Sequence, residues 1–191
     1  MSAQSSLVLT LVGPDRPGLV EAVSKIIVRH GANWLESRMV RLAGKFAGVL
    51  LIEVPPAGAD ALAAALSGLA DQGLKIVIEP SVEAEGPPMS HVLRLELTGH
   101  DRPGIVSQIS HVLAERGVNV EELTTGRSSA PMSGEPLFHA EVWLLAPVDL
   151  CLAELTGALE GLANDLMVDI TLVPVNAEPK AARSKPRGLA G

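Results

Sequence analysis

The sequence predicts an α+β fold made of two successive βαββαβ units, each a four-stranded antiparallel sheet with two helices on one face. Two observations carry this prediction. One six-residue segment occurs twice, as Gly13-Pro14-Asp15-Arg16-Pro17-Gly18 and as Gly99-His100-Asp101-Arg102-Pro103-Gly104. After each copy, the hydrophobic patterns typical of helices and strands follow in the same order, which indicates an internal repeat.

The first unit shows each expected element in turn. An alternating apolar run predicts a strand, and apolar residues at helical spacing after Pro17 predict a helix that Gly31 ends. Pro17 suits the first helical turn, because its missing N–H costs nothing there. Beyond Gly31 we expect a hairpin, a second helix that Gly73 closes and a last strand. The expected strands and helices are 7–12, 19–27, 33–42, 46–54, 62–69 and 74–78.

The second unit repeats this order at an offset of 86 residues. Between 13–33 and 99–119, nine of the 21 aligned residues are identical. The offset later rises to 92, where Phe46 aligns with Phe138, so six residues have been added within Ser128–Pro136. We place this insertion at the tip of the second hairpin.

These boundaries divide the chain into four parts. We expect a first domain at 1–82, a linker at 83–90, a second domain at 91–174 and a disordered tail at 175–191. The linker contains prolines, and its apolar residues follow neither the helical nor the strand period. The tail is rich in Ala and Pro and cannot bury enough apolar surface to order itself.

Composition and charge limit the function classes. A formal net charge of −7 argues against a nucleic-acid binder, which usually carries a basic face. The single Cys151 excludes an intramolecular disulfide framework, and we expect its thiol to be packed. No run approaches the ~18 apolar residues of a membrane helix, and the start of the chain lacks the basic region of a signal peptide. We expect a cytoplasmic protein that contacts neither membrane nor nucleic acid directly.

No pattern typical of catalysis is found in the sequence. Neither a Ser/His/Asp nor a Cys/His arrangement appears, a phosphate-binding loop of the G-x-x-x-x-G-K-[ST] type is absent, and the histidines lack metal-ligand spacing. We therefore expect no enzymatic activity, no cofactor and no metal.

The two glycine loops are the candidate binding sites. A loop that leaves a strand and opens a helix presents backbone N–H groups at the positive end of the helix dipole, which suits a small anion such as an amino-acid carboxylate. Asp15 and Asp101 could bind a ligand's ammonium group or satisfy N–H groups at the helix start. Gly18 and Gly104 could admit a ligand close to the backbone or allow tight helix–sheet packing.

Other polar residues near the loops also have two explanations. Asn33 and Asn119 could contact a ligand or be ordinary turn residues after a helix cap. His100 could reach a ligand in the second copy only, because the first copy has Pro14 at that position.

Two pairs of arginines align across the repeat. We expect Arg16 and Arg102 to form surface ion pairs with the loop aspartates rather than to bind a ligand. Arg41 and Arg127 are expected to be solvated strand ends.

The pattern of a strand, then G-x-D-R-P-G-[LI]-V, a helix ending in Gly and an Asn two residues later resembles the ACT domain, a small-molecule-binding regulatory module. The resemblance covers about 165 of the 191 residues as two tandem copies. A free-standing pair of this length with a longer second hairpin is similar to the glycine cleavage system transcriptional repressor family.

This resemblance implies ferredoxin-like units that bind an amino acid at the seam between paired units. Joining the two units edge to edge would give an eight-stranded sheet with both loops near the seam. Some amino-acid binders have a His three residues before the Arg, where this chain has Gly. The resemblance therefore implies candidate ligand-binding residues at the positions that match the family's motif, and His100 is added because it lies in the second loop. The candidates are Gly13, Asp15, Gly18, Asn33, Gly99, His100, Asp101, Gly104 and Asn119.

The resemblance also implies a function. Repressors of this type bind glycine and act on a transcription activator by protein contact, so we expect an amino-acid-sensing regulator of glycine cleavage transcription. The alternative is a free-standing regulatory subunit that controls a metabolic enzyme. A homodimer is compatible with either function.

Overall fold

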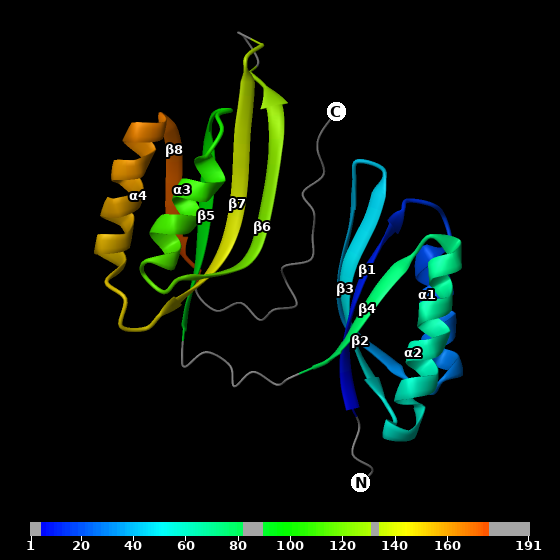
Figure 1. The fold of residues 1–191 in the computed structure, drawn as a ribbon. Helices are drawn as coiled ribbons and strands as arrows, with labels where there is room; N and C mark the ends of the chain where they lie inside the picture. Colours follow the sequence, from blue (N-terminus) through cyan, green and yellow to red (C-terminus); the bar gives the residue numbers. More distant parts are fainter. Residues whose placement is uncertain (1–4, 82–89, 131–133, 176–191) are drawn as a thin grey trace. The chain divides into compact units, whose positions relative to one another are not determined.

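The computed structural model describes residues 5–81, 90–130 and 134–175 (Figure 1). The chain divides into two compact units, Met1–Ala84 and Glu85–Gly191. Residues 83–89 of the expected linker and 176–191 of the expected tail lie outside the described residues. Ser90, expected in the linker, is instead the first residue of a strand.

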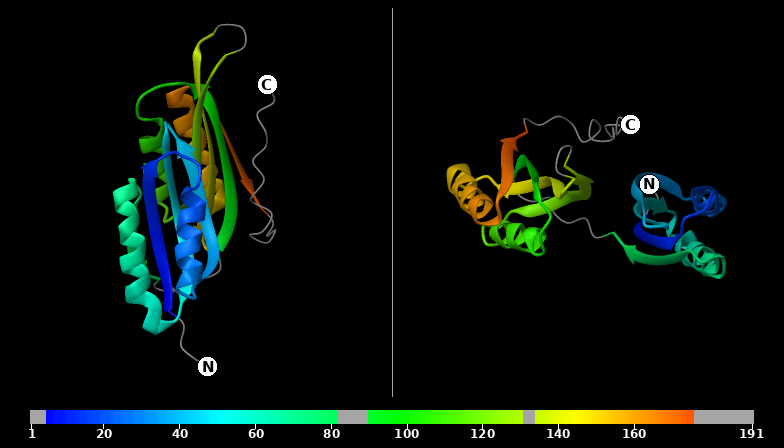
Figure 2. Two further views of the ribbon diagram at one scale, coloured as in Figure 1. Left: turned by 90° about the vertical axis from the view of Figure 1, so that its right-hand side faces the viewer. Right: turned by 90° about the horizontal axis from the view of Figure 1, so that it is seen from above.

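The first unit is a βαββαβ unit. Its sheet has the strand order β2-β3-β1-β4 with antiparallel neighbours, and its helices lie on one face of that sheet (Figures 1 and 2). Gly31 and Gly73 adopt positive φ angles at the expected helix ends. The elements are β1 Ser5–Pro14, α1 Leu19–Arg29, β2 Asn33–Leu42, β3 Lys45–Val54, α2 Ala59–Ser67 and β4 Lys75–Pro80, with short 3-10 helices η1 Pro56–Gly58 and η2 Gly68–Gln72.

The second unit repeats this architecture with the strand order β6-β7-β5-β8. Its two helices again share one face of the sheet (Figure 2). The added residues fall between β6 and β7, as expected, and 131–133 lie outside the described part. The elements are β5 Ser90–His100, α3 Ile105–Ala114, β6 Asn119–Ser129, β7 Pro136–Pro147, α4 Leu152–Leu166 and β8 Val168–Pro174.

Each unit has its own aliphatic core between the helices and the sheet. In the first unit, alternate residues of β1 such as Leu9 and Leu11 point toward α1, whose Val23 and Ile27 are also buried. Leu93, Leu95 and Leu97 of β5 take the same place in the second unit. The predicted α+β fold of two βαββαβ units is confirmed, whereas the edge-to-edge joining of the two sheets stays a prediction.

Two smaller expectations are wrong. Leu166, Val168 and Ile170 repeat the apolar pattern of 74–78, so the sequence predicts a last strand from Leu166. Instead, Leu166 ends α4, because Met167 turns the chain with a φ of 54° before β8. Cys151 precedes α4 and is exposed rather than packed. Among the described helices, none combines the length and the apolar content needed to span a membrane.

Candidate ligand-binding loops

Each glycine loop joins the first strand of a unit to its first helix. Gly18 and Gly104 are the N-cap residues of α1 and α3, with φ angles of 90° and 96°. No side chain caps either helix, so the N–H groups of the first turn face outward without a side-chain acceptor. A Cβ placed on Gly18 would meet no atom within 4 Å. The Gly18 backbone is therefore unobstructed on the side where a Cβ would lie, and a helix start without a side-chain cap can bind a small anion.

The loop aspartates are bound to the neighbouring hairpin. Asp15 Oδ2 lies 2.6 Å from Arg41 Nε, and Asp101 forms the equivalent ion pair with Arg127. The Asp15 backbone N–H donates to the carbonyl oxygen of Gly44 in the β2–β3 turn. Because neither helix has a side-chain cap, the helix-capping explanation of the aspartates is wrong.

The arginines thus take different roles from those expected. Arg16 donates to the backbone oxygen of Gln72 at 2.8 Å, and Arg102 approaches Met167 Sδ at 3.8 Å. Both attach the loop to the segment before the last strand. The expected ion pairs between these arginines and the aspartates are wrong, and Arg41 and Arg127 form them instead. The alignment of Arg41 with Arg127 across the repeat was the signal that could have found this pairing.

Gly13 and Gly99 have a packing role that the sequence did not reveal. A Cβ on Gly13 would lie 2.8 Å from the carbonyl oxygen of Gly73, and a Cβ on Gly99 would lie 2.5 Å from Val168 Cγ1. Real side chains do not approach so closely, so a larger residue would push the last strand away. These two glycines allow the end of the first strand to contact the start of the last strand.

The asparagines lie at the other end of their sheets. Asn33 is opposite Glu53, which pairs with Ser6, whereas the loop follows Gly13 on the same strand. Seven residues of extended chain, about 3.3 Å each, separate the two ends by roughly 23 Å. Within one unit the structure therefore does not bring Asn33 to the loop. Asn119 has the equivalent place, and its Nδ2 donates to Glu121 Oε1 at 2.9 Å.

The two loops are not identical. His100 ends β5 with its Nδ1 3.7 Å from Glu135 Oε2, whereas Pro14 occupies the aligned position in the first unit. The second unit also has a shallow, open apolar groove that begins beside its loop at Val106. The groove is lined by Val106, Ile109, Ser110, Leu113, Val120, Leu123, Phe138, Ala140 and Val142.

Metal coordination has no support in the described ranges. Within them, no three His, Cys, Asp or Glu side chains are grouped so that they could hold a metal ion. The acidic groups of the loops already have arginine partners. What the loops offer is a helix start, a carboxylate and a guanidinium within one small region, which matches the charges of a zwitterionic amino acid.

Two four-stranded sheets, each with two helices on one face and a D-R-P-G loop, define a tandem regulatory module of the βαββαβ type. Residues 5–79 and 93–142 each match the ACT domain. The chain belongs to the ACT-domain family and carries two copies in tandem.

Among its relatives is the glycine cleavage system transcriptional repressor of Escherichia coli (strain K12). The two are 23% identical over 180 residues, which cover 92% of this chain and 93% of the repressor. Phosphoserine phosphatase SerB2 of Mycobacterium tuberculosis is 28% identical over 183 residues, which cover 90% of this chain and 41% of the phosphatase.

Solved structures agree on the fold. A protein of unknown function from Galdieria sulphuraria has a TM-score of 0.82 and 30% sequence identity, with 91% of this chain and all of that chain covered. A putative glycine cleavage system transcriptional repressor has a TM-score of 0.66 at 20% identity, over 92% of this chain and all of that chain. The protein is thus a tandem ACT-domain regulatory protein that resembles this repressor over nearly its whole length.

Proposed function

We propose that the protein senses a small amino acid, glycine above all, and regulates transcription of the glycine cleavage system by contact with a transcription activator. The observation that supports this most directly is the paired loop geometry. Each uncapped helix start lies in the same loop as an aspartate that is already paired with an arginine from the hairpin. The similarity to the repressor across nearly all of both chains supports the choice of ligand and partner.

Binding would rearrange charges that are already present. The ligand carboxylate would lie at the N-terminus of α1, where the helix dipole and free N–H groups favour an anion. Its ammonium group would compete with Arg41 for the carboxylate of Asp15. This ion pair is exposed, with Arg41 at 73% of its side-chain surface, so exchanging its partner costs little.

The hairpin offers a route from ligand to partner. Asp15 is connected to the β2–β3 turn through its backbone N–H and its side chain. A ligand that draws Asp15 away from Arg41 would therefore change the preferred position of this turn. Regulation needs such a difference in ligand affinity between two states, since equal affinity for both shifts nothing.

Isothermal titration calorimetry with single amino acids tests the ligand. We expect heat with glycine or serine, lost in the double variant D15N/D101N and retained in the control D60N/D165N, which removes two exposed helical carboxylates. Valine and leucine belong in the panel because the residues beside the loop of the second unit line a shallow apolar groove. Folded protein that binds none of these amino acids would overturn the proposal.

The alternative partner is a metabolic enzyme. It is favoured by the similarity to part of a phosphoserine phosphatase, in which the matching region covers 41% of the protein. Deleting the gene and measuring glycine cleavage transcripts with and without glycine separates the two functions. Unchanged transcripts, together with co-purification of an enzyme, would favour the subunit. We place the protein in the cytoplasm and expect no mobility shift of DNA by the chain alone.

A further inference from the structure

The sheet of the first unit has one face that its own helices do not cover. The pairing register places the side chains of this face in three rows of four, one from each strand. We call it the open face of the first unit. Its rows are Val40, Ala47, Val12 and Lys75; then Arg38, Val49, Thr10 and Val77; then Glu36, Leu51, Val8 and Glu79.

The open face is mostly apolar, and its charged residues lie along its two outer edges. Val49, near the middle, exposes 48% of its surface, and Val40 and Val77 each expose 58%. Charged residues occupy only the two outer strands. Large apolar side chains side by side on an exposed sheet mark an interaction surface rather than the scatter found on any protein.

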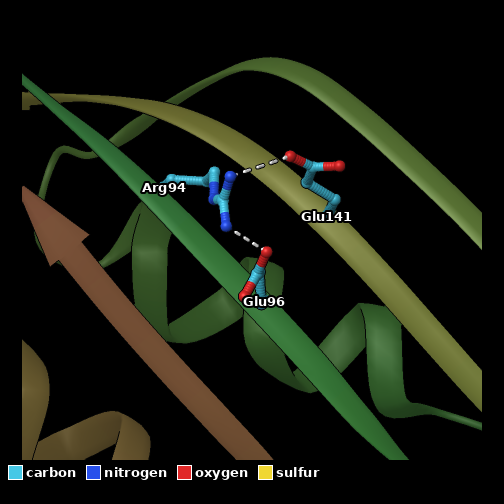
Figure 3. A network of polar contacts seen from close by, with 3 residues as sticks. All are labelled: Arg94, Glu96 and Glu141. Atoms are coloured by element: carbon cyan, nitrogen blue, oxygen red, sulfur yellow. Dashed lines mark hydrogen bonds and ion pairs between the residues drawn. The ribbon is translucent and has the colours of Figure 1, made fainter. Parts of the chain in front are cut away.

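The second unit shows that the fold itself does not require an apolar face. At the positions that align with Val8 and Val49, it has Arg94 and Glu141, and these two form an ion pair at 3.7 Å (Figure 3). Arg94 also pairs with Glu96. Water can solvate this charged network. The exposed valines of the first unit, in contrast, lower the free energy only when another surface covers them and removes them from water.

We propose that the open face of the first unit binds the same face of a second copy and forms a two-fold symmetric homodimer. A two-fold contact requires a surface that complements itself. With the axis perpendicular to the strands through the row of Val49 and Val77, each of these valines meets its own copy. The same operation places Lys75 of one copy opposite Glu79 of the other, twice per dimer. The two Arg38 side chains of the axis row meet once, at the outer strand β2, where each also has Glu36 of its own chain as an ion-pair partner. An axis along the strands would instead place Glu79 opposite Glu36, which is repulsive.

The size of the face sets the strength of the dimer. With strands about 4.8 Å apart and rows about 6.7 Å apart, three rows of four cover roughly 400 Å² of plane per copy. Two copies then bury on the order of 800 Å² or somewhat more, which lies in the range of weak, reversible interfaces below about 1,200 Å². The dimer is therefore expected to dissociate on dilution.

Sedimentation velocity of the full chain over a range of concentrations tests the proposal. We expect a concentration-dependent monomer–dimer equilibrium that V49E weakens at least tenfold, because two glutamates would meet at the axis. The control is V28E, which makes the same change at a valine of α1 that is 73% exposed and far from the open face in the fold. Monomer at every concentration, or a dimer that V49E leaves as stable as V28E does, overturns the proposal.

Charge exchange tests the orientation of the two copies. K75E and E79K should each weaken the dimer, since like charges then face each other. An equimolar mixture of the two variants should restore it, because each glutamate of one copy then meets a lysine of the other. If the mixture associates no more strongly than either variant alone, the proposed axis is wrong. Circular dichroism of each variant shows that it is folded.

Discussion

Replacing Gly104 by alanine should cost the second unit stability through the backbone alone. Gly104 has a φ of 96°, and an added Cβ would meet only the flexible Gln108 side chain, at 3.5 Å from its Nε2. Steric overlap is therefore absent, and the cost comes from holding an L-residue in the left-handed region. That cost is about 1–3 kcal/mol. For a domain of this size, a loss of about 2 kcal/mol lowers the melting temperature by about 8–16 °C.

The matched control is G157A in the same unit. Gly157 lies inside α4, and a Cβ there meets nothing within 4 Å, so alanine should stabilise the unit by about 0.5–1 kcal/mol. Urea unfolding followed by Trp143 fluorescence in a W34F background reports on the second unit. G104N should lose less stability than G104A, because Asn visits the left-handed region more readily. A G104A variant as stable as the parent would refute this reasoning.

Three further predictions follow from other contacts. R41M should change the free energy of unfolding by less than about 1 kcal/mol, because the arginine is largely exposed; a larger loss in urea unfolding would mean that the ion pair is structural. G99A should cost about 1–3 kcal/mol, because its Cβ would overlap Val168, including the backbone Cα at 2.8 Å; a G99A variant as stable as the parent in urea unfolding would contradict the contact. The pKa of Glu21 is lowered by its hydrogen bond to Lys25 and by the lysine's charge. The pair therefore stabilises the fold above the ordinary carboxyl pKa and loses this contribution as the pH falls. K25M should raise the pKa of Glu21 in an NMR titration, and an unchanged value would count against the pair.

The repeat made most of the fold accessible from sequence. Strand and helix periods are local properties, and the offset between the two copies showed twice where each element begins and ends. Glycines at helix ends could be assigned because a positive φ favours glycine wherever it occurs. The end of α4 was misplaced because Met167 takes that conformation without being glycine, and no residue type signals such a turn.

The binding site was only partly accessible. The sequence identified both loops, since their chemistry depends on a helix start that immediately follows a glycine turn. It could not assign the partner of Asp15, because Arg41 reaches it only through the register of β1 on β3 and of β2 on β3. The same register carries Asn33 to the far end of the sheet.

By itself, the sequence determined that this chain is two copies of one βαββαβ unit, each with a glycine loop at the start of its first helix. Periodicity and repetition are written along the chain, so they need no knowledge of distant contacts. The tertiary structure alone decided which arginine holds each aspartate, why Gly99 must be small and which valines gather on one open face. Those facts depend on how strands far apart in sequence align, and strand register is a property of the assembled sheet.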